Sequence, residues 1–157
     1  MHQLPPADGG CGITPHLYVE DASAAIAFYR RVFGAREQRR IPGRGGGVVR
    51  AELVIGCARL TLGDADDGTG SPEPRAFGGT AVTLEVGVDD PQAIFARALV
   101  AGARALPPVD GAPPAGGRFE DPFGHRWRVT PRPGPLPGAG VRSPGGSIKG
   151  AAAGPPP

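Results

Sequence analysis

The chain has 157 residues, which suits one domain with its own hydrophobic core and is short for two ordinary domains. No apolar run approaches the roughly 18 residues of a membrane-spanning helix, and the first ten residues lack the pattern of a secretory signal. The formal charge is only +2 and few aromatic residues lie among the arginines. We therefore expect neither a membrane nor a nucleic acid as a partner.

Two cysteines, Cys11 and Cys57, form neither a metal-binding spacing nor a CxxC pair. This pattern predicts two reduced thiols and a cytoplasmic protein.

Composition divides the chain into three parts. Residues 1–11 are expected to form a flexible N-terminal arm, and residues 12–131 to form the folded domain. Residues 132–157 are more than half Gly or Pro and have no apolar periodicity. Such a segment buries too little apolar surface to offset its ordering entropy, so it predicts a disordered tail.

Within the domain, one pattern occurs twice. The stretch "VEDASAAIAFYRRVFGAR" (19–36) is echoed by "VDDPQAIFARALVAGAR" (88–104). Asp21 and Asp90 are suitable helix N-caps, and Gly34 and Gly102 are suitable C-terminal stops. Apolar residues recur at helical spacing between them, so each stretch predicts one amphipathic helix.

Strand-like segments surround both predicted helices. One precedes each helix and three follow it, and "IGCA" (55–58) and "DPFGH" (121–125) have the composition of hairpin turns. The order β-α-β-β-β therefore occurs in two modules, at about 12–63 and 80–131. One helix for every four strands predicts an α+β fold.

Four segments carry a family resemblance: "ITPHLYVEDASAAIAFYRRVFGA", "RAELVIGCARLTLGD", "LEVGVDDPQAIFARALVAGA" and "FEDPFGHRW". Together they resemble the vicinal oxygen chelate superfamily, with the glyoxalase/bleomycin resistance/dioxygenase fold, and most closely its PhnB-like branch. The resemblance implies two tandem βαβββ modules forming a U-shaped, half-open barrel with helices on its convex side. It also implies a homodimer whose partner borders the cavity. It does not imply one reaction, because the superfamily contains isomerases, dioxygenases and drug-binding proteins.

Metal-dependent members of the superfamily hold a divalent ion with four His or Glu side chains from four strands. The resemblance places these ligand positions at Thr14, Thr61, Thr83 and Arg128. Threonine is a poor ligand for such an ion, and the arginine guanidinium is a permanent cation. We therefore expect no metal and no cofactor. The alternative is a divalent ion held by an unorthodox set of His16, Glu52 and Glu85.

Strand alternation predicts which side chains face the cavity. The predicted ligand-binding residues are His16, Tyr18, Arg50, Glu52, Arg59, Glu85, Arg126 and Arg128. Their arginine surplus favours a ligand with carboxylate, phosphonate, carbonyl or hydroxyl oxygens, unless these arginines form a solvated sheet face. Trp127 is expected to pack under the second helix, and Trp127 and Phe119 are further candidates for aromatic contact with the ligand. His125 is expected to be structural, and Asp121 to accept backbone N–H bonds in its turn.

Three functional hypotheses remain open. The first is a metal-free, dimeric binding protein that sequesters a polar, oxygen-rich metabolite or antibiotic. The second is an enzyme of the same superfamily, a lyase, isomerase or dioxygenase, either metal-dependent or acting by acid/base chemistry. Its weak catalytic candidates are Glu52, Glu85 and His16. The third is an accessory domain that docks to another protein through its Pro/Gly-rich tail.

Overall fold

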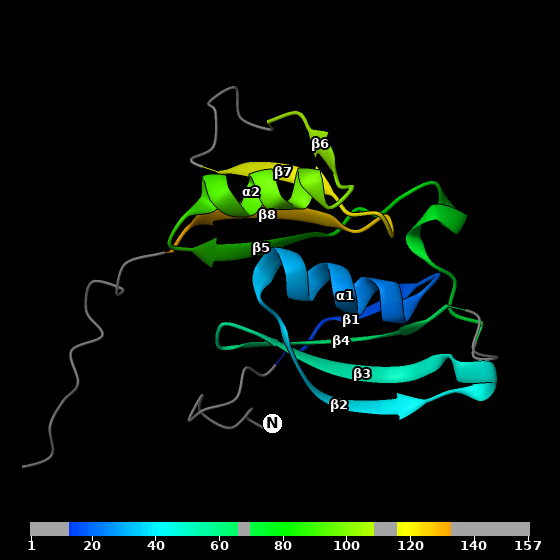
Figure 1. Ribbon diagram of the computed structural model, residues 1–157. Coiled ribbons are helices and arrows are strands. Elements are labelled where there is room, and N and C mark those ends of the chain that lie inside the picture. Colours follow the sequence, from blue (N-terminus) through cyan, green and yellow to red (C-terminus); the bar gives the residue numbers. More distant parts are fainter. Residues whose placement is uncertain (1–12, 66–69, 109–115, 133–157) are drawn as a thin grey trace, which may run out of the picture.

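The computed structural model describes residues 13–65, 70–108 and 116–132 (Figure 1). The arm expected over residues 1–11 and, apart from Arg132, the tail expected over residues 132–157 lie outside these ranges. Within them the chain forms two open four-stranded sheets and two α-helices, as the predicted α+β class requires. None of these helices combines the length and the apolar character needed to cross a bilayer.

The first βαβββ unit builds the first sheet. Its elements are β1 (His16–Val19), α1 (Ala22–Phe33), β2 (Arg36–Pro42), β3 (Val48–Ile55) and β4 (Ala58–Asp64). The strand order is β1-β4-β3-β2, with β1 parallel to β4 and the other neighbours antiparallel. A short 3-10 turn, η1 (Arg44–Gly46), joins β2 to β3.

The second unit repeats this connection. Its elements are β5 (Thr83–Val88), α2 (Pro91–Val100), β6 (Arg104–Leu106), β7 (Gly117–Glu120) and β8 (Arg126–Pro131). The order is β5-β8-β7-β6, with β5 parallel to β8. A 3-10 turn, η2 (Pro74–Phe77), lies in the connection between the units. The predicted repeat is thus confirmed at the level of topology.

Local sequence sets the helix ends as expected. Asp21 accepts a hydrogen bond from the backbone N–H of Ala24, and Asp90 accepts one from that of Ala93, both at 2.9 Å. Gly34 ends α1 with φ of 66°, in the left-handed region that glycine adopts at little cost.

Helix α1 is shared by both sheets. In Figure 1 the two helices lie on the same side of the sheets, and α1 lies between β5 of one sheet and β1 of the other. The Trp127 ring of β8 packs against Tyr29 and Phe33 of α1, with ring centroids 5.4 and 4.7 Å apart. The predicted position of Trp127 under the second helix did not include these contacts with the aromatic side chains of α1. One core consequently joins the two units.

Strand alternation separates an apolar face from a polar face in each sheet. Leu17, Leu53 and Leu62 of the first sheet and Trp127 and Val129 of the second are buried on the helix side. The intervening residues of the same strands form the opposite faces, which we call the polar faces. These faces carry the predicted ligand-binding side chains.

Candidate functional site

The polar face of the first sheet holds a row of four side chains across its strands. Strand register places Arg39 opposite Glu52, Glu52 opposite Thr61, and Thr61 opposite His16. In a neighbouring row Arg36 and Arg59 both lie opposite Val54, and farther along β3 Arg50 lies opposite Ile41. His16, Tyr18 and Glu52 are half-buried, whereas Arg50 and Arg59 are exposed.

His16 is engaged within this row. Its Nδ1 lies 2.8 Å from the hydroxyl oxygen of Thr61, and that hydroxyl donates to the carbonyl oxygen of Pro15 at 3.1 Å. Because a hydroxyl has only one hydrogen, donation to Pro15 requires the His16 tautomer with its hydrogen on Nδ1. The His16 ring also contacts the Tyr18 ring edge-on, with centroids 4.7 Å apart. This arrangement fixes the imidazole on the polar face.

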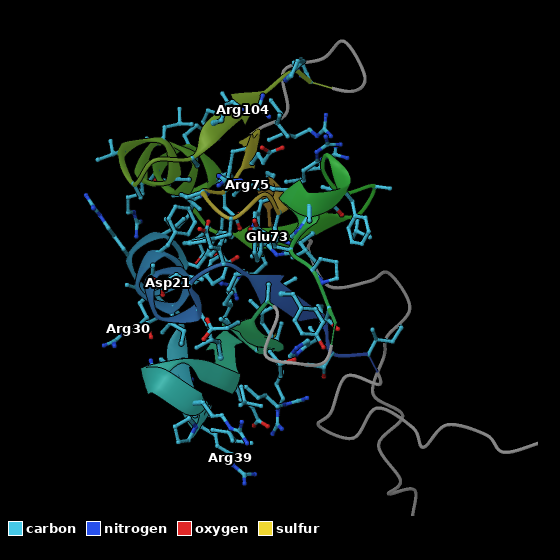
Figure 2. All side chains as sticks on the ribbon, turned by 90° about the vertical axis from the view of Figure 1, so that its right-hand side faces the viewer. Asp21, Arg30, Arg39, Glu73, Arg75 and Arg104 are labelled. Atoms are coloured by element: carbon cyan, nitrogen blue, oxygen red, sulfur yellow. The ribbon has the colours of Figure 1, made fainter. Side chains whose placement is uncertain are left out.

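The polar face of the second sheet is built from charged rows. Register aligns Thr83, Arg126, Glu120 and Arg104 in one row, and Glu85, Arg128 and Arg118 in the next. Glu120 lies 3.1 Å from Arg104 and 3.7 Å from Arg126, and Glu85 lies 3.9 Å from Arg128. Figure 2 places Arg39 and Arg104, which lie on the outer strands, at opposite ends of the molecule.

Sequence reasoning missed several members of these rows, namely Arg36, Arg39, Arg104, Arg118 and Glu120. Strand alternation in "GRFE" (117–120) was the available signal for the last two, since they flank the buried Phe119. Their cross-strand partners depend on register, which the short strands β6 and β7 do not reveal from sequence.

The residues at the expected ligand positions do not fit a divalent ion. Thr14 is exposed and precedes β1, and Thr61 is bonded to His16 and to Pro15. Arg128 brings a permanent positive charge to the fourth position. Among the residues that the structure describes, no group of three His, Cys, Asp or Glu side chains is placed to hold a metal. The alternative trio of His16, Glu52 and Glu85 is not brought together as such a group in the described part of the chain.

Two hollows lie along the junction between β1 and β5. One of about 290 Å³ is lined by His16, His125 and Arg126 together with apolar side chains. The other, of about 140 Å³, is lined by Arg59, Glu85 and Trp127 among others. Pro15 and Leu84 line both. The junction therefore brings together four of the predicted ligand-binding residues in two adjoining pairs.

The remaining predicted residues line neither of these hollows. Tyr18, Arg50 and Glu52 lie on the open polar face of the first sheet, and Arg128 lies on that of the second. Phe119 is fully buried, so the idea that it contacts a ligand is wrong. Trp127 is only 4% exposed and reaches one hollow from the core side.

A buried carboxylate fixes the second sheet against α1 and β1. Oδ1 of Asp121 accepts the backbone N–H groups of Phe123 and His125, as its turn position predicts. Oδ2 accepts the Tyr29 hydroxyl at 2.7 Å and the Trp127 indole N–H at 2.8 Å. The turn also positions Nε2 of His125 3.0 Å from the carbonyl oxygen of Tyr18. His125 is thus structural, as expected.

The Tyr29 hydroxyl remains a donor in this cluster. Its burial, and then the negative charge of Asp121, raise the pKa of Tyr29 well above the ordinary value for tyrosine. The phenol is consequently protonated at neutral pH and stabilises the Asp121 carboxylate.

The sequence matches the model of the Glyoxalase/Bleomycin resistance protein/Dioxygenase superfamily over residues 13–129. An uncharacterized protein of Mycobacterium tuberculosis is 39% identical over 123 residues, covering 74% of this chain and 72% of that protein. A Mycobacterium bovis protein, also uncharacterized, is equally similar and is covered over 80% of its length.

Solved structures share the fold. TioX from Micromonospora sp. ML1 is 27% identical with a TM-score of 0.56, over 78% of this chain and 99% of that one. The fosfomycin resistance protein FosX of Listeria monocytogenes, solved with Mn(II) and a dihydroxypropylphosphonic acid, has a TM-score of 0.60. It is 14% identical over 80% of this chain and 94% of its own, which supports the fold alone. The family match, the βαβββ repeat and the open sheets agree, and this chain belongs to the Glyoxalase/Bleomycin resistance protein/Dioxygenase superfamily.

Proposed function

We propose that this protein is a metal-independent binding protein that sequesters a small, polar, oxygen-rich metabolite or antibiotic. The observation that carries the proposal is the set of residues at the expected metal-ligand positions. Three threonines and an arginine replace His and Glu there, and the Thr61 hydroxyl is already bonded to His16 and Pro15. On the basis of its sequence motifs we propose that the chain is nearest the PhnB-like branch of the superfamily, and we propose a cytoplasmic location.

The charge of the polar faces supports an oxygen-rich ligand. By strand register these faces carry eight arginines and three glutamates: Arg36, Arg39, Arg50, Arg59, Arg104, Arg118, Arg126 and Arg128 against Glu52, Glu85 and Glu120. Guanidinium groups bind carboxylate and phosphate oxygens most strongly, and they also donate hydrogen bonds to neutral hydroxyl oxygens. The apolar walls and Trp127 edge at the β1–β5 junction supply the remaining contact area.

The openness of the faces supports a homodimer. Side chains of Arg50, Arg126 and Arg128 are 46%, 37% and 39% exposed in one chain. Binding sites for small molecules usually enclose most of the ligand's surface, which a single open sheet does not do. A second copy, related by a two-fold axis, would provide the missing wall.

A ligand screen tests this proposal. Thermal unfolding is followed with polar metabolites and oxygen-rich antibiotics, in the presence of a chelator. We expect a saturable rise of the unfolding temperature for a subset of them, because a ligand that binds only the folded state stabilises it by mass action. Mass spectrometry should recover the ligand unchanged, and no rise for any compound would contradict sequestration.

One observation favours an acid/base enzyme as the second candidate. Glu52 lies in the same row as Thr61 and His16, so its carboxylate shares the polar face with a fixed imidazole. A carboxylate there could remove a proton while the arginines stabilise the resulting anion. Conversion of a bound compound that is lost in Glu52→Gln would favour this enzyme over sequestration.

A further inference from the structure

Two arginines of β8 have buried donors without acceptors. The Nε atoms of Arg126 and Arg128 are enclosed yet make no hydrogen bond within the described part of the chain. Their nearest carboxylate oxygens, on Glu120 and Glu85, lie at 3.7 and 3.9 Å, which is too long for a hydrogen bond. An unsatisfied buried donor is costly, and such groups usually have a water or ion as partner.

A third arginine faces this pair. Register places Arg118 of β7 directly opposite Arg128 of β8, and opposed like charges on neighbouring strands destabilise a sheet. One Nη of Arg118 donates to the carbonyl oxygen of Pro107, the residue after β6, at 2.8 Å. The arrangement therefore concentrates positive charge at one place on the polar face.

Local carboxylates compensate this charge only partly. The Glu120 carboxylate forms ion pairs with both Arg104 and Arg126. Glu85 is 57% exposed and faces Arg128 at a distance where solvent screens the interaction. Four guanidinium groups on this face thus share two carboxylates, which leaves an excess of positive charge.

We propose that Arg118, Arg126 and Arg128 form an oxyanion subsite that binds a carboxylate, sulfate, phosphate or phosphonate group. The inference rests on the proposed function and narrows it: the sequestered molecule is an acid, and this subsite holds its anionic group. An oxyanion over these three residues would accept from the outer N–H groups of the partly exposed Arg126 and Arg128 side chains and relieve the repulsion between Arg118 and Arg128.

Inorganic sulfate and phosphate are suitable probes, measured against chloride at equal ionic strength. We expect both oxyanions to raise the unfolding temperature of the full chain saturably, beyond the effect of chloride. Arg118→Gln and Arg128→Gln should each weaken this binding about tenfold or more, because each removes a charge-assisted hydrogen bond. The control Arg31→Gln removes an exposed charge from the last turn of α1 and should leave the binding unchanged.

The unfolding temperature of Arg118→Gln without oxyanion shows whether Arg118 has a binding role or only a structural one. Without oxyanion and at low salt, Arg118→Gln should unfold at a higher temperature than the unmodified chain, because the like-charge pair is gone. A residue needed only for packing would lower the unfolding temperature instead, which would overturn the subsite.

Two further results would also overturn the subsite. One is that sulfate and phosphate raise the unfolding temperature no more than chloride does. The other is that Arg31→Gln weakens the binding of sulfate and phosphate as much as Arg118→Gln does. A neutral compound from the ligand screen that binds the unmodified chain and Arg128→Gln equally would overturn the subsite and leave sequestration standing. An acid from the same screen that Arg128→Gln binds at least tenfold more weakly supports the subsite as the place for the ligand's own anionic group.

Discussion

Replacing Asp121 with asparagine is expected to lower the free energy of unfolding by about 2 kcal/mol or more. Each carboxylate oxygen of Asp121 accepts two hydrogen bonds, and the residue is only 2% exposed. An amide nitrogen in place of either oxygen turns two acceptor positions into donors. The indole N–H of Trp127 or two backbone N–H groups would then be buried without a partner, at about 1–3 kcal/mol.

The control for this substitution is Asp89→Asn. Asp89 is paired with Arg132 at 3.0 Å, but its side chain is 84% exposed, so we expect a change within about 0.5 kcal/mol. Urea unfolding at neutral pH measures both variants, and the fluorescence of Trp127, the single tryptophan, reports directly on the cluster. Equal stability of Asp121→Asn and Asp89→Asn would show that the buried carboxylate does not hold the two units together.

Gly63→Ala is expected to destabilise the protein by about 2 kcal/mol through backbone overlap. Gly63 is buried in β4, and a Cβ atom there would lie 2.3 Å from the carbonyl oxygen of Val49 in β3. Backbone cannot yield as a flexible side chain would, so β3 and β4 must separate locally. The next residue, Asp64, accepts the N–H groups of Ala22 and Val48, and the shift should weaken both contacts.

Gly56→Ala is the control that separates the overlap of an added Cβ atom from the cost of a left-handed backbone conformation. Gly56 has φ of 60° at the β3–β4 hairpin, but a Cβ atom there meets no heavy atom within 4 Å. We expect a loss of about 1 kcal/mol from the left-handed backbone alone. Both variants are measured by thermal unfolding, and a larger loss at Gly56 than at Gly63 would contradict the packing argument.

Short-range patterns were sufficient to predict most of the fold. The caps Asp21 and Asp90 and the stop at Gly34 are local signals that the structure confirms. The hydrogen bond between Tyr29 and Asp121 could not be predicted from such local patterns, because it joins residues 92 positions apart. The same holds for Trp127, whose helical neighbour depends on how the two sheets share α1.

The sequence predicts which side chains lie on the polar face of each sheet, but it does not predict which of them lie opposite one another. Alternation places His16, Glu52 and Arg128 on polar faces from sequence alone. Which side chains oppose one another depends on register, and the bulges between β2 and β3 shift it within the strand pair. Arg118 lies opposite Arg128 because of the register between β7 and β8, so this pair of like charges could be identified only in the fold.

Metal content tests the central claim of metal-independent binding most directly. The protein would be purified without chelator and analysed by mass spectrometry, then again after loading with nickel, zinc, cobalt, iron and manganese. We expect no stoichiometric ion under any loading, because the Thr14, Thr61, Thr83 and Arg128 positions offer no suitable ligands. One tightly held ion per chain would contradict the account and direct attention to His16 with Glu52 or Glu85 as a metal centre.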